Sequence, residues 1–115
     1  MAWNVVLTER FGVWLDGLEA DVRAEIRGHL FLVVERGPNL GRPYVDTVKG
    51  SDYANMKELR VQVAGNPWRV LFAFDPTRSA IILVGGNKAG NRRWYKTHIP
   101  IADALFKEHL EGLKF

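Results

Sequence analysis

Residues 57–95, KELRVQVAGNPWRVLFAFDPTRSAIILVGGNKAGNRRWY, decide the fold of this chain. The stretch holds three strand-like apolar runs, Lys57–Val63, Trp68–Phe74 and Ser79–Val84. Segments rich in Gly, Asn, Asp and Pro separate the runs, and such segments form turns. Two successive hairpins predict an antiparallel meander. The middle run is apolar on both faces apart from one arginine, which predicts that it is the central strand.

The residues before the meander predict one strand and two helices. Apolar side chains alternate over residues 3–7, as in a short strand. Residues 8–17 have helical spacing, with Thr8 as a helix N-cap. Residues 19–36 carry an apolar stripe at helical spacing and end at Gly37, which is typical of a second helix. Two such helices need an apolar surface on which to lie.

The remaining segments predict a long connection and a last helix. Residues 37–56 show no sustained period and predict a surface connection with a brief extended piece around Tyr44–Val48. Apolar spacing over Ile101–Leu113 predicts a C-terminal helix, with Pro100 near its first turn. The predicted fold class is α+β, in one domain over residues 1–115. In it, an N-terminal strand and a helical hairpin pack on an antiparallel meander that a C-terminal helix follows.

Composition favours an ordinary globular protein. The chain is 47% apolar and 25% charged, which disfavours wholesale disorder. It has no cysteine, which excludes disulfides and thiolate chemistry. Its apolar runs are too short to cross a bilayer, and MAWNVVLTERF lacks the pattern of a secretory signal. We therefore expect a cytoplasmic protein with no membrane partner.

The distribution of charge predicts an anion-binding surface. The formal net charge is +3, and half of the 16 basic residues fall within residues 57–96. The same stretch contains only Glu58 and Asp75 among the 13 acids. A solvated charged face normally mixes both signs, so this excess of cations favours an anionic partner.

Arg69 is the most informative single residue, because it lies in an otherwise apolar strand. An unpaired buried cation costs several kcal/mol. Arg69 therefore either pairs with a carboxylate, with Glu58 across the hairpin as the obvious candidate, or opens into a concave surface that binds an anion. Arg60 on the neighbouring strand favours the anion. A phosphate offers acceptors to both guanidinium groups, whereas one carboxylate does not naturally satisfy two.

The residues after the meander suggest contacts with nucleic acid. Residues 85–91, GGNKAGN, do not have the lysine spacing of a nucleotide-binding phosphate loop and predict a turn that exposes Lys88. Residues 92–96, RRWYK, interleave cations with aromatics, as in surfaces that hold phosphates and stack unpaired bases. The alternative is that Trp94 and Tyr95 pack inward while the cations are solvated.

The spacing of the histidines does not favour a metal site, and only His98 is a candidate proton carrier. His29, His98 and His109 lie far apart in the sequence, without metal-ligand spacing. His98 comes three residues after Tyr95 and could reach the same surface as a proton carrier near neutral pH.

These motifs together resemble a known protein family. KELRV at 57–61, RVLFAFDP at 69–76, LVGGNKAGN at 83–91 and WY at 94–95 resemble the RelE/ParE toxin superfamily. The resemblance is greatest to its HigB branch, also described as phage-derived Gp49-like proteins. GRPYVDTVKGS at 41–51 and IPIADAL at 99–105 fit the same branch, so the resemblance covers nearly the whole chain.

The resemblance implies the toxin of a type II toxin–antitoxin system. Such a toxin is an endoribonuclease that cuts mRNA on the ribosome, needs no metal or small-molecule cofactor, and is held inactive by a helix-turn-helix antitoxin. The 2′-hydroxyl of the substrate attacks the adjacent phosphate. A non-catalytic phage-derived module that binds nucleic acid, or a ParE-like inhibitor of DNA gyrase, remain alternatives.

The resemblance also suggests roles for individual residues. It implies that Arg69 binds the scissile phosphate, that Arg60 assists it, and that Lys88 approaches the same phosphate. It implies that Tyr95 stacks a base or transfers a proton, with His98 as its rival for the general base. Further substrate contacts are expected from Lys57, Arg92, Arg93 and Trp94. Glu58 departs from RelE-type relatives, which carry more lysines on this strand.

Overall fold

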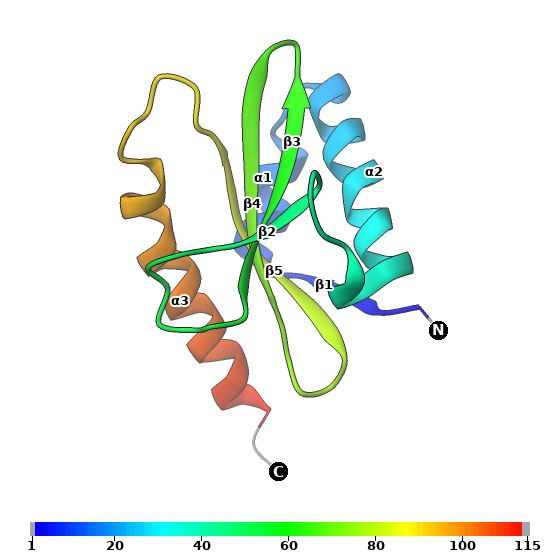
Figure 1. Ribbon diagram of the computed structural model, residues 1–115, viewed down its shortest axis with the longest axis vertical. Helices are drawn as coiled ribbons and strands as arrows, with labels where there is room; N and C mark the ends of the chain where they lie inside the picture. Colours follow the sequence, from blue (N-terminus) through cyan, green and yellow to red (C-terminus); the bar gives the residue numbers. More distant parts are fainter. Residues whose placement is uncertain (1, 114–115) are drawn as a thin grey trace.

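The computed structural model describes residues 2–113 and shows a five-stranded sheet between helices (Figure 1). In chain order the elements are β1 (Asn4–Leu7), α1 (Glu9–Asp16), α2 (Ala20–Arg36), a 3-10 turn (Gly37–Asn39), β2 (Val45–Thr47), β3 (Met56–Val63), β4 (Asn66–Phe74), β5 (Ser79–Asn87) and α3 (Trp94–Gly112). The predicted α+β class and the order of its elements are confirmed.

The sheet is larger than the predicted meander, and it is mixed. Its strand order is β1-β5-β4-β3-β2. The predicted extended piece is β2, which pairs antiparallel with β3. The first strand also joins the sheet, because β1 pairs parallel with β5 from Asn4 opposite Ser79 to Leu7 opposite Ile82. The predicted antiparallel meander is confirmed as β3, β4 and β5, and the parallel pairing of β1 is an addition that the sequence did not predict.

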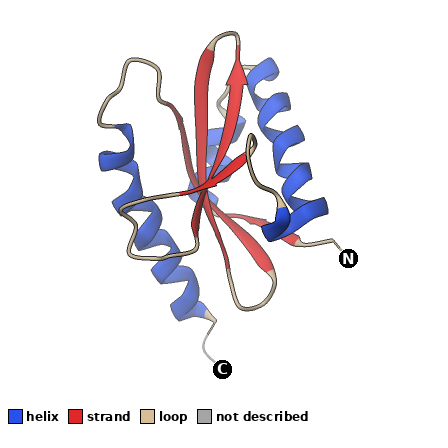
Figure 2. Ribbon diagram, in the orientation of Figure 1, coloured by secondary structure: helices blue, strands red, loops and turns tan. Residues whose placement is uncertain are grey.

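Helices cover both faces of the sheet (Figure 2). Helices α1 and α2 lie on one face, where Ile26 and Phe72 belong to the core. Helix α3 lies on the other face, where Leu71 and Phe106 belong to a second core. The central strands β4 and β5 are therefore buried on both sides, which explains why their sequences are almost continuously apolar.

The predicted boundaries of the first two helices are confirmed. Thr8 caps α1, and its hydroxyl oxygen accepts a hydrogen bond from the Phe11 amide at 3.3 Å. Gly37 ends α2 with a positive φ of 54°. A Cβ at this position would lie 2.3 Å from the Trp3 ring, so the residue must be glycine for two independent reasons.

Strand β5 extends beyond its predicted end at Val84. It continues through Gly85 and Gly86 to Asn87, and these glycines make room for indole rings on opposite faces. A Cβ on Gly85 would lie 2.5 Å from the Trp14 ring, and one on Gly86 would lie 2.4 Å from Trp94 Nε1. The paired glycines, which resemble a turn in sequence, therefore serve close packing within a strand.

Helix α3 begins seven residues before its predicted start, at Trp94 rather than Ile101. Pro100 consequently lies inside the helix, where it removes one backbone hydrogen bond. The early start is held by Trp94, which is only 2% exposed and packs over β5. Neither this helix nor any other within residues 2–113 is long and apolar enough to cross a membrane.

Asp75 fixes the turn between β4 and β5 and ties it to the end of α3. Its Oδ1 accepts hydrogen bonds from the Thr77 amide at 2.9 Å, the Thr77 hydroxyl at 2.7 Å and the Ser79 amide at 3.1 Å. Its Oδ2 lies 2.7 Å from His109 Nε2. Burial raises the pKa of the Asp75 carboxyl, but these hydrogen bonds outweigh burial and leave that pKa below its ordinary value.

We expect Asp75→Ala to lower the free energy of unfolding by about 2–3 kcal/mol at pH 7, because several hydrogen bonds are removed at once. Since the pKa of Asp75 is lowered by folding, its contribution is present above the ordinary carboxyl pKa and disappears as the pH falls below about 4. The difference between wild type and variant, measured by urea unfolding, should therefore shrink in acid. Asp16→Ala is the control, because the Asp16 side chain is 77% exposed.

Candidate functional site

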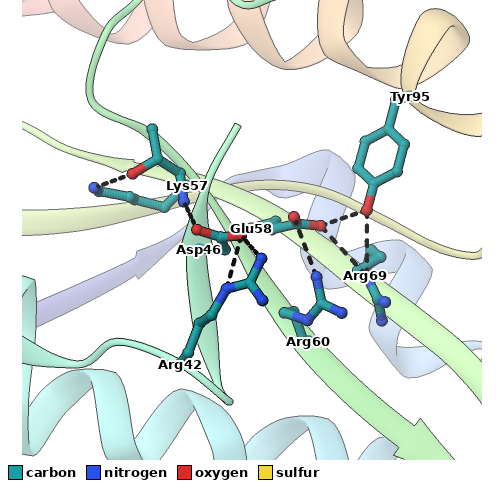
Figure 3. Close-up of polar contacts among 8 residues, drawn as sticks. Arg42, Asp46, Lys57, Glu58, Arg60, Arg69 and Tyr95 are labelled. Carbon is teal, nitrogen blue, oxygen red and sulfur yellow. Dashed lines mark hydrogen bonds and ion pairs between the residues drawn. The ribbon is translucent and has the colours of Figure 1, made fainter. Parts of the chain in front are cut away.

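The predicted cations meet where β3, β4 and the first turn of α3 come together. Arg60 on β3 lies opposite Arg69 on β4, and Arg69 lies opposite Gly86 on β5. Because Gly86 has no side chain, Trp94 packs directly over it. This packing sets the first turn of α3 above the two arginines, and Tyr95 reaches down to them (Figure 3).

Glu58 is at the centre of this arrangement. The Tyr95 hydroxyl donates a hydrogen bond to Glu58 Oε1 at 2.5 Å. Arg69 Nε donates to the Tyr95 oxygen at 3.3 Å and lies 3.3 Å from Glu58 Oε1. Arg60 Nη1 lies 3.6 Å from the other carboxylate oxygen, Glu58 Oε2. We call Glu58, Arg60, Arg69 and Tyr95 the carboxylate cluster (Figure 3).

The structure decides between the two alternatives for Arg69 in favour of a carboxylate partner. One carboxylate does serve two guanidinium groups here, because each uses a different oxygen of Glu58. Cross-strand arginines would otherwise repel each other. The Arg69 side chain is 5% exposed, and its Nη1 donates to the Trp68 carbonyl at 3.0 Å. The Arg60 side chain is 35% exposed, so Arg60 is the arginine that solvent reaches.

Tyr95 keeps its proton at neutral pH. Burial raises the pKa of the Tyr95 hydroxyl, and the hydrogen bond to Glu58 raises it further. The hydrogen bond from Arg69 lowers that pKa, but by less. The Tyr95 hydroxyl therefore donates its proton to Glu58. Its oxygen can accept a proton from another group only if the hydroxyl proton moves to Glu58 at the same time.

Lys88 approaches the carboxylate cluster from the loop after β5. Its amide donates to the Pro67 carbonyl at 3.0 Å, which fixes the loop beside the start of β4. Its ammonium nitrogen lies 5.4 Å from the centre of the Tyr95 ring, a cation–π distance. The sequence-based expectation that Arg60, Arg69, Lys88 and Tyr95 lie together agrees with this geometry.

An open depression of about 380 Å³ adjoins the cluster, and Glu58, Arg60 and Tyr95 form part of its wall. Arg42 and Lys49 also line it. Arg42 was not among the predicted site residues, because it lies far from the meander in sequence. It reaches the site because β2 pairs with β3, and its guanidinium lies 2.6 Å from Asp46 Oδ2.

None of the four residues predicted as further substrate contacts belongs to the carboxylate cluster. Lys57 alternates with Glu58 along β3, so it points to the opposite face, where its Nζ donates to the Thr47 hydroxyl at 2.8 Å. Arg92 and Arg93 are exposed in the loop before α3. Trp94 is a core residue over Gly86. The expectation that Trp94 stacks a substrate base is corrected, because the missing side chain at Gly86 admits the indole.

His98 does not join the carboxylate cluster. Its ring stacks on Trp94 at a centroid distance of 4.3 Å, and its Nδ1 lies 2.8 Å from the Trp94 carbonyl oxygen. It lines a separate depression of about 300 Å³ with Trp14 and Arg10. No group of three or more His, Asp or Glu side chains within residues 2–113 is arranged to hold a metal ion.

The chain is similar to known proteins over most of its length. Residues 13–107 match the family of phage-derived Gp49-like proteins. The candidate toxin HigB3 of Mycobacterium tuberculosis is 51% identical over 100 residues, which are 86% of this chain and 86% of HigB3. The candidate toxin HigB2 of the same organism is 48% identical over 104 residues. The match covers 89% of this chain but only 52% of HigB2, so this chain spans about half of that relative.

Two solved structures share the fold. A double mutant of the Escherichia coli toxin RelE in the free state has a TM-score of 0.57 at 15% identity, over 82% of this chain and 92% of RelE. A chain of the toxin–antitoxin complex RelBE2 of M. tuberculosis has a TM-score of 0.59 at 15% identity, over 76% of this chain and 99% of that chain. The chain therefore shares the fold of RelE toxins, and it belongs to the phage-derived Gp49-like family as a relative of the HigB toxins.

Proposed function

We propose that this HigB-like toxin is an endoribonuclease that cuts mRNA on the ribosome without a metal ion. The observation that carries the proposal is the position of the Tyr95 hydroxyl. It forms hydrogen bonds with Glu58 and Arg69, and it lies beside a depression that Arg60 lines. A proton-transfer group, its acceptor and an accessible cation thus stand together, as phosphate-ester cleavage requires.

In the proposed reaction, the 2′-hydroxyl oxygen of one nucleotide attacks the adjacent phosphorus. Its proton moves to the Tyr95 oxygen while the Tyr95 proton moves to Glu58, along the 2.5 Å hydrogen bond between them. The bond from phosphorus to the 5′-oxygen breaks, and the Lys88 ammonium donates a proton to the leaving oxygen. The products are a 2′,3′-cyclic phosphate and a 5′-hydroxyl end.

The two arginines have different parts in this reaction. Arg60 is accessible and approaches the phosphate oxygens, where negative charge grows in the transition state. Arg69 is buried and holds Tyr95 and Glu58 in position from beneath. Arg60 and Arg69 pair with Glu58, and Lys88 lies over the Tyr95 ring. Three cations near one carboxylate give the site a positive field for the substrate.

The proposed partner that restrains the toxin is a cognate helix-turn-helix antitoxin. The names of the M. tuberculosis relatives support a toxin. A protein of the same fold has been solved in a toxin–antitoxin complex, which supports an antitoxin partner for this chain.

We expect Arg60→Ala to lower the rate at which ribosome-bound mRNA is cut by about 10²–10³-fold, because one cation that stabilises the transition state is removed. Primer extension on mRNA from stalled translation complexes measures the rate. Arg27→Ala is the matched control, since Arg27 is a 60% exposed arginine on α2, across the sheet from the cluster.

Equal cutting by Arg60→Ala and wild type would remove Arg60 from the mechanism. Uncut mRNA with salt-sensitive RNA binding would favour the non-catalytic module instead. Inhibition of gyrase supercoiling in the absence of ribosomes would favour the ParE-like alternative.

A further inference from the structure

A second depression, of about 620 Å³, shares Tyr95 and Lys49 with the lining of the depression beside Arg60. It runs between residues 49–53 and residues 95–107 of α3. We call it the lysine pocket, after Lys49, Lys96 and Lys107, which line it. Its volume falls within the usual range of small-molecule sites, about 300–1,000 Å³.

The walls of the lysine pocket are fixed by hydrogen bonds. Asp103 on α3 is 9% exposed. Its carboxylate accepts from the Ser51 hydroxyl at 2.5 Å and from the Asp52 amide at 2.9 Å. The Ser51 hydroxyl oxygen in turn accepts from the Tyr53 amide at 3.0 Å. Residues 50–53 are therefore tied to α3, and the pocket exists before any ligand arrives.

The lining combines aromatic, apolar and cationic groups. Tyr53 lines the pocket and is held by an edge-to-face contact with Phe106, with ring centroids 5.0 Å apart. Ile99 and Ala104 add apolar surface from α3. The three lysines face two acids, Asp52 and Asp103, and the Asp103 carboxylate is already engaged by the segment it fixes.

This combination fits one chemical class of ligand. A nucleotide of single-stranded RNA carries a base with two π faces for the tyrosine and apolar surfaces, and phosphates for the lysines. Because Tyr95 lines the pocket and also belongs to the carboxylate cluster, the pocket adjoins the cluster. An RNA strand that crosses the cluster would therefore place its next nucleotide here.

We propose that the lysine pocket holds the nucleotide next to the scissile phosphate, with its base against Tyr53 and its phosphate among Lys49, Lys96 and Lys107. The inference rests on the proposed ribonuclease function and adds a binding site to it. It assigns part of the affinity for RNA to residues that take no part in bond breaking.

The test uses the isolated full chain and a fluorescein-labelled RNA hexamer that carries 2′-O-methyl groups at every residue, so that binding is measured without cleavage. Lys96→Ala/Lys107→Ala should weaken binding about tenfold or more in fluorescence anisotropy. It should also lower the slope of log affinity against log salt by about 0.7 for each RNA phosphate that the variant no longer neutralises. Arg27→Ala/Arg36→Ala is the control, because it removes the same charge from α2 on the opposite face.

A second variant separates the base from the phosphate. Ala104 is exposed on the pocket wall, so Ala104→Trp fills the pocket without removing a charge. We expect it to weaken binding about tenfold, as the loss of one stacked base does, and to leave the salt slope unchanged. Circular dichroism and thermal unfolding confirm that each variant is folded.

The outcomes distinguish this proposal from the proposed function. Both variants binding as tightly as the α2 control would overturn the lysine pocket, whatever the cleavage assay shows. Failure of the wild-type chain to bind the hexamer would overturn it too. Weakened binding by both variants, with mRNA left uncut by wild type, would support the pocket and refute the ribonuclease.

Discussion

Tyr95→Phe should lower the rate of mRNA cleavage by about 10²–10⁴-fold, because it removes the hydroxyl that in the proposed reaction relays the proton from the 2′-hydroxyl to Glu58. The phenylalanine ring keeps the aromatic surface that both depressions share. A large loss of rate with little change in RNA affinity would therefore locate the effect in proton transfer. Single-turnover cleavage and anisotropy on the uncleavable hexamer measure the two quantities separately.

The fold should tolerate this change. Glu58 keeps Arg69 and Arg60 as partners after the hydroxyl is removed, so we expect a cost of about 1 kcal/mol in unfolding free energy. His98→Ala is the comparison for the rival proton carrier, because His98 lies on Trp94 in a separate depression. Cleavage that survives Tyr95→Phe but not His98→Ala would reverse the assignment.

Arg69→Ala should lower the free energy of unfolding by about 3 kcal/mol, because it leaves the carboxylate of Glu58, 8% exposed, without its nearest cation. The estimate is at the low end for a broken buried pair, since Arg60 and Tyr95 still contact Glu58. Urea unfolding of the isolated chain measures the loss. A cost below about 1 kcal/mol would show that Arg69 contributes little to the cluster.

A second substitution shows whether the loss of unfolding free energy in Arg69→Ala comes from the unpaired carboxylate of Glu58. Adding Glu58→Gln to Arg69→Ala removes the uncompensated charge, so the double variant should be more stable than the sum of the two single effects predicts. The same physics makes Arg69→Ala a poor test of catalysis, because reduced cutting could come from reduced stability. Arg60→Ala avoids the difficulty, since the Arg60 side chain is 35% exposed.

Periodicity predicted the elements whose pattern is local. The runs of β3 and β4 and the stripe of α2 are visible in one segment at a time, and all three form as expected. The parallel pairing of β1 with β5 is not visible in this way, because it joins residues about 75 positions apart. The predicted end of β5 at Val84 was too early, because Gly85 and Gly86 resemble a turn in sequence. Their packing against Trp14 and Trp94, which come from distant elements, is not visible in the local pattern.

The candidate site was partly visible in the sequence. The excess of cations drew attention to β3 and β4, and the register of their hairpin brings Arg60 opposite Arg69. One of the two predicted alternatives paired Glu58 with Arg69, but neither included the hydrogen bond from Tyr95 to Glu58. That bond depends on where α3 begins and how it lies on the sheet. The position of α3 depends on Trp94, which occupies the space above Gly86. The early start of α3 was not predicted, because Pro100 is typical of the first turn of a helix.

The most direct test of the central claim is the chemistry of the RNA ends produced by wild-type chain on ribosome-bound mRNA. The proposed attack by the 2′-hydroxyl predicts cut mRNA whose downstream fragments carry a 5′-hydroxyl, so that polynucleotide kinase labels them without prior phosphatase treatment. Intact mRNA, or fragments that carry a 5′-phosphate, would contradict the account.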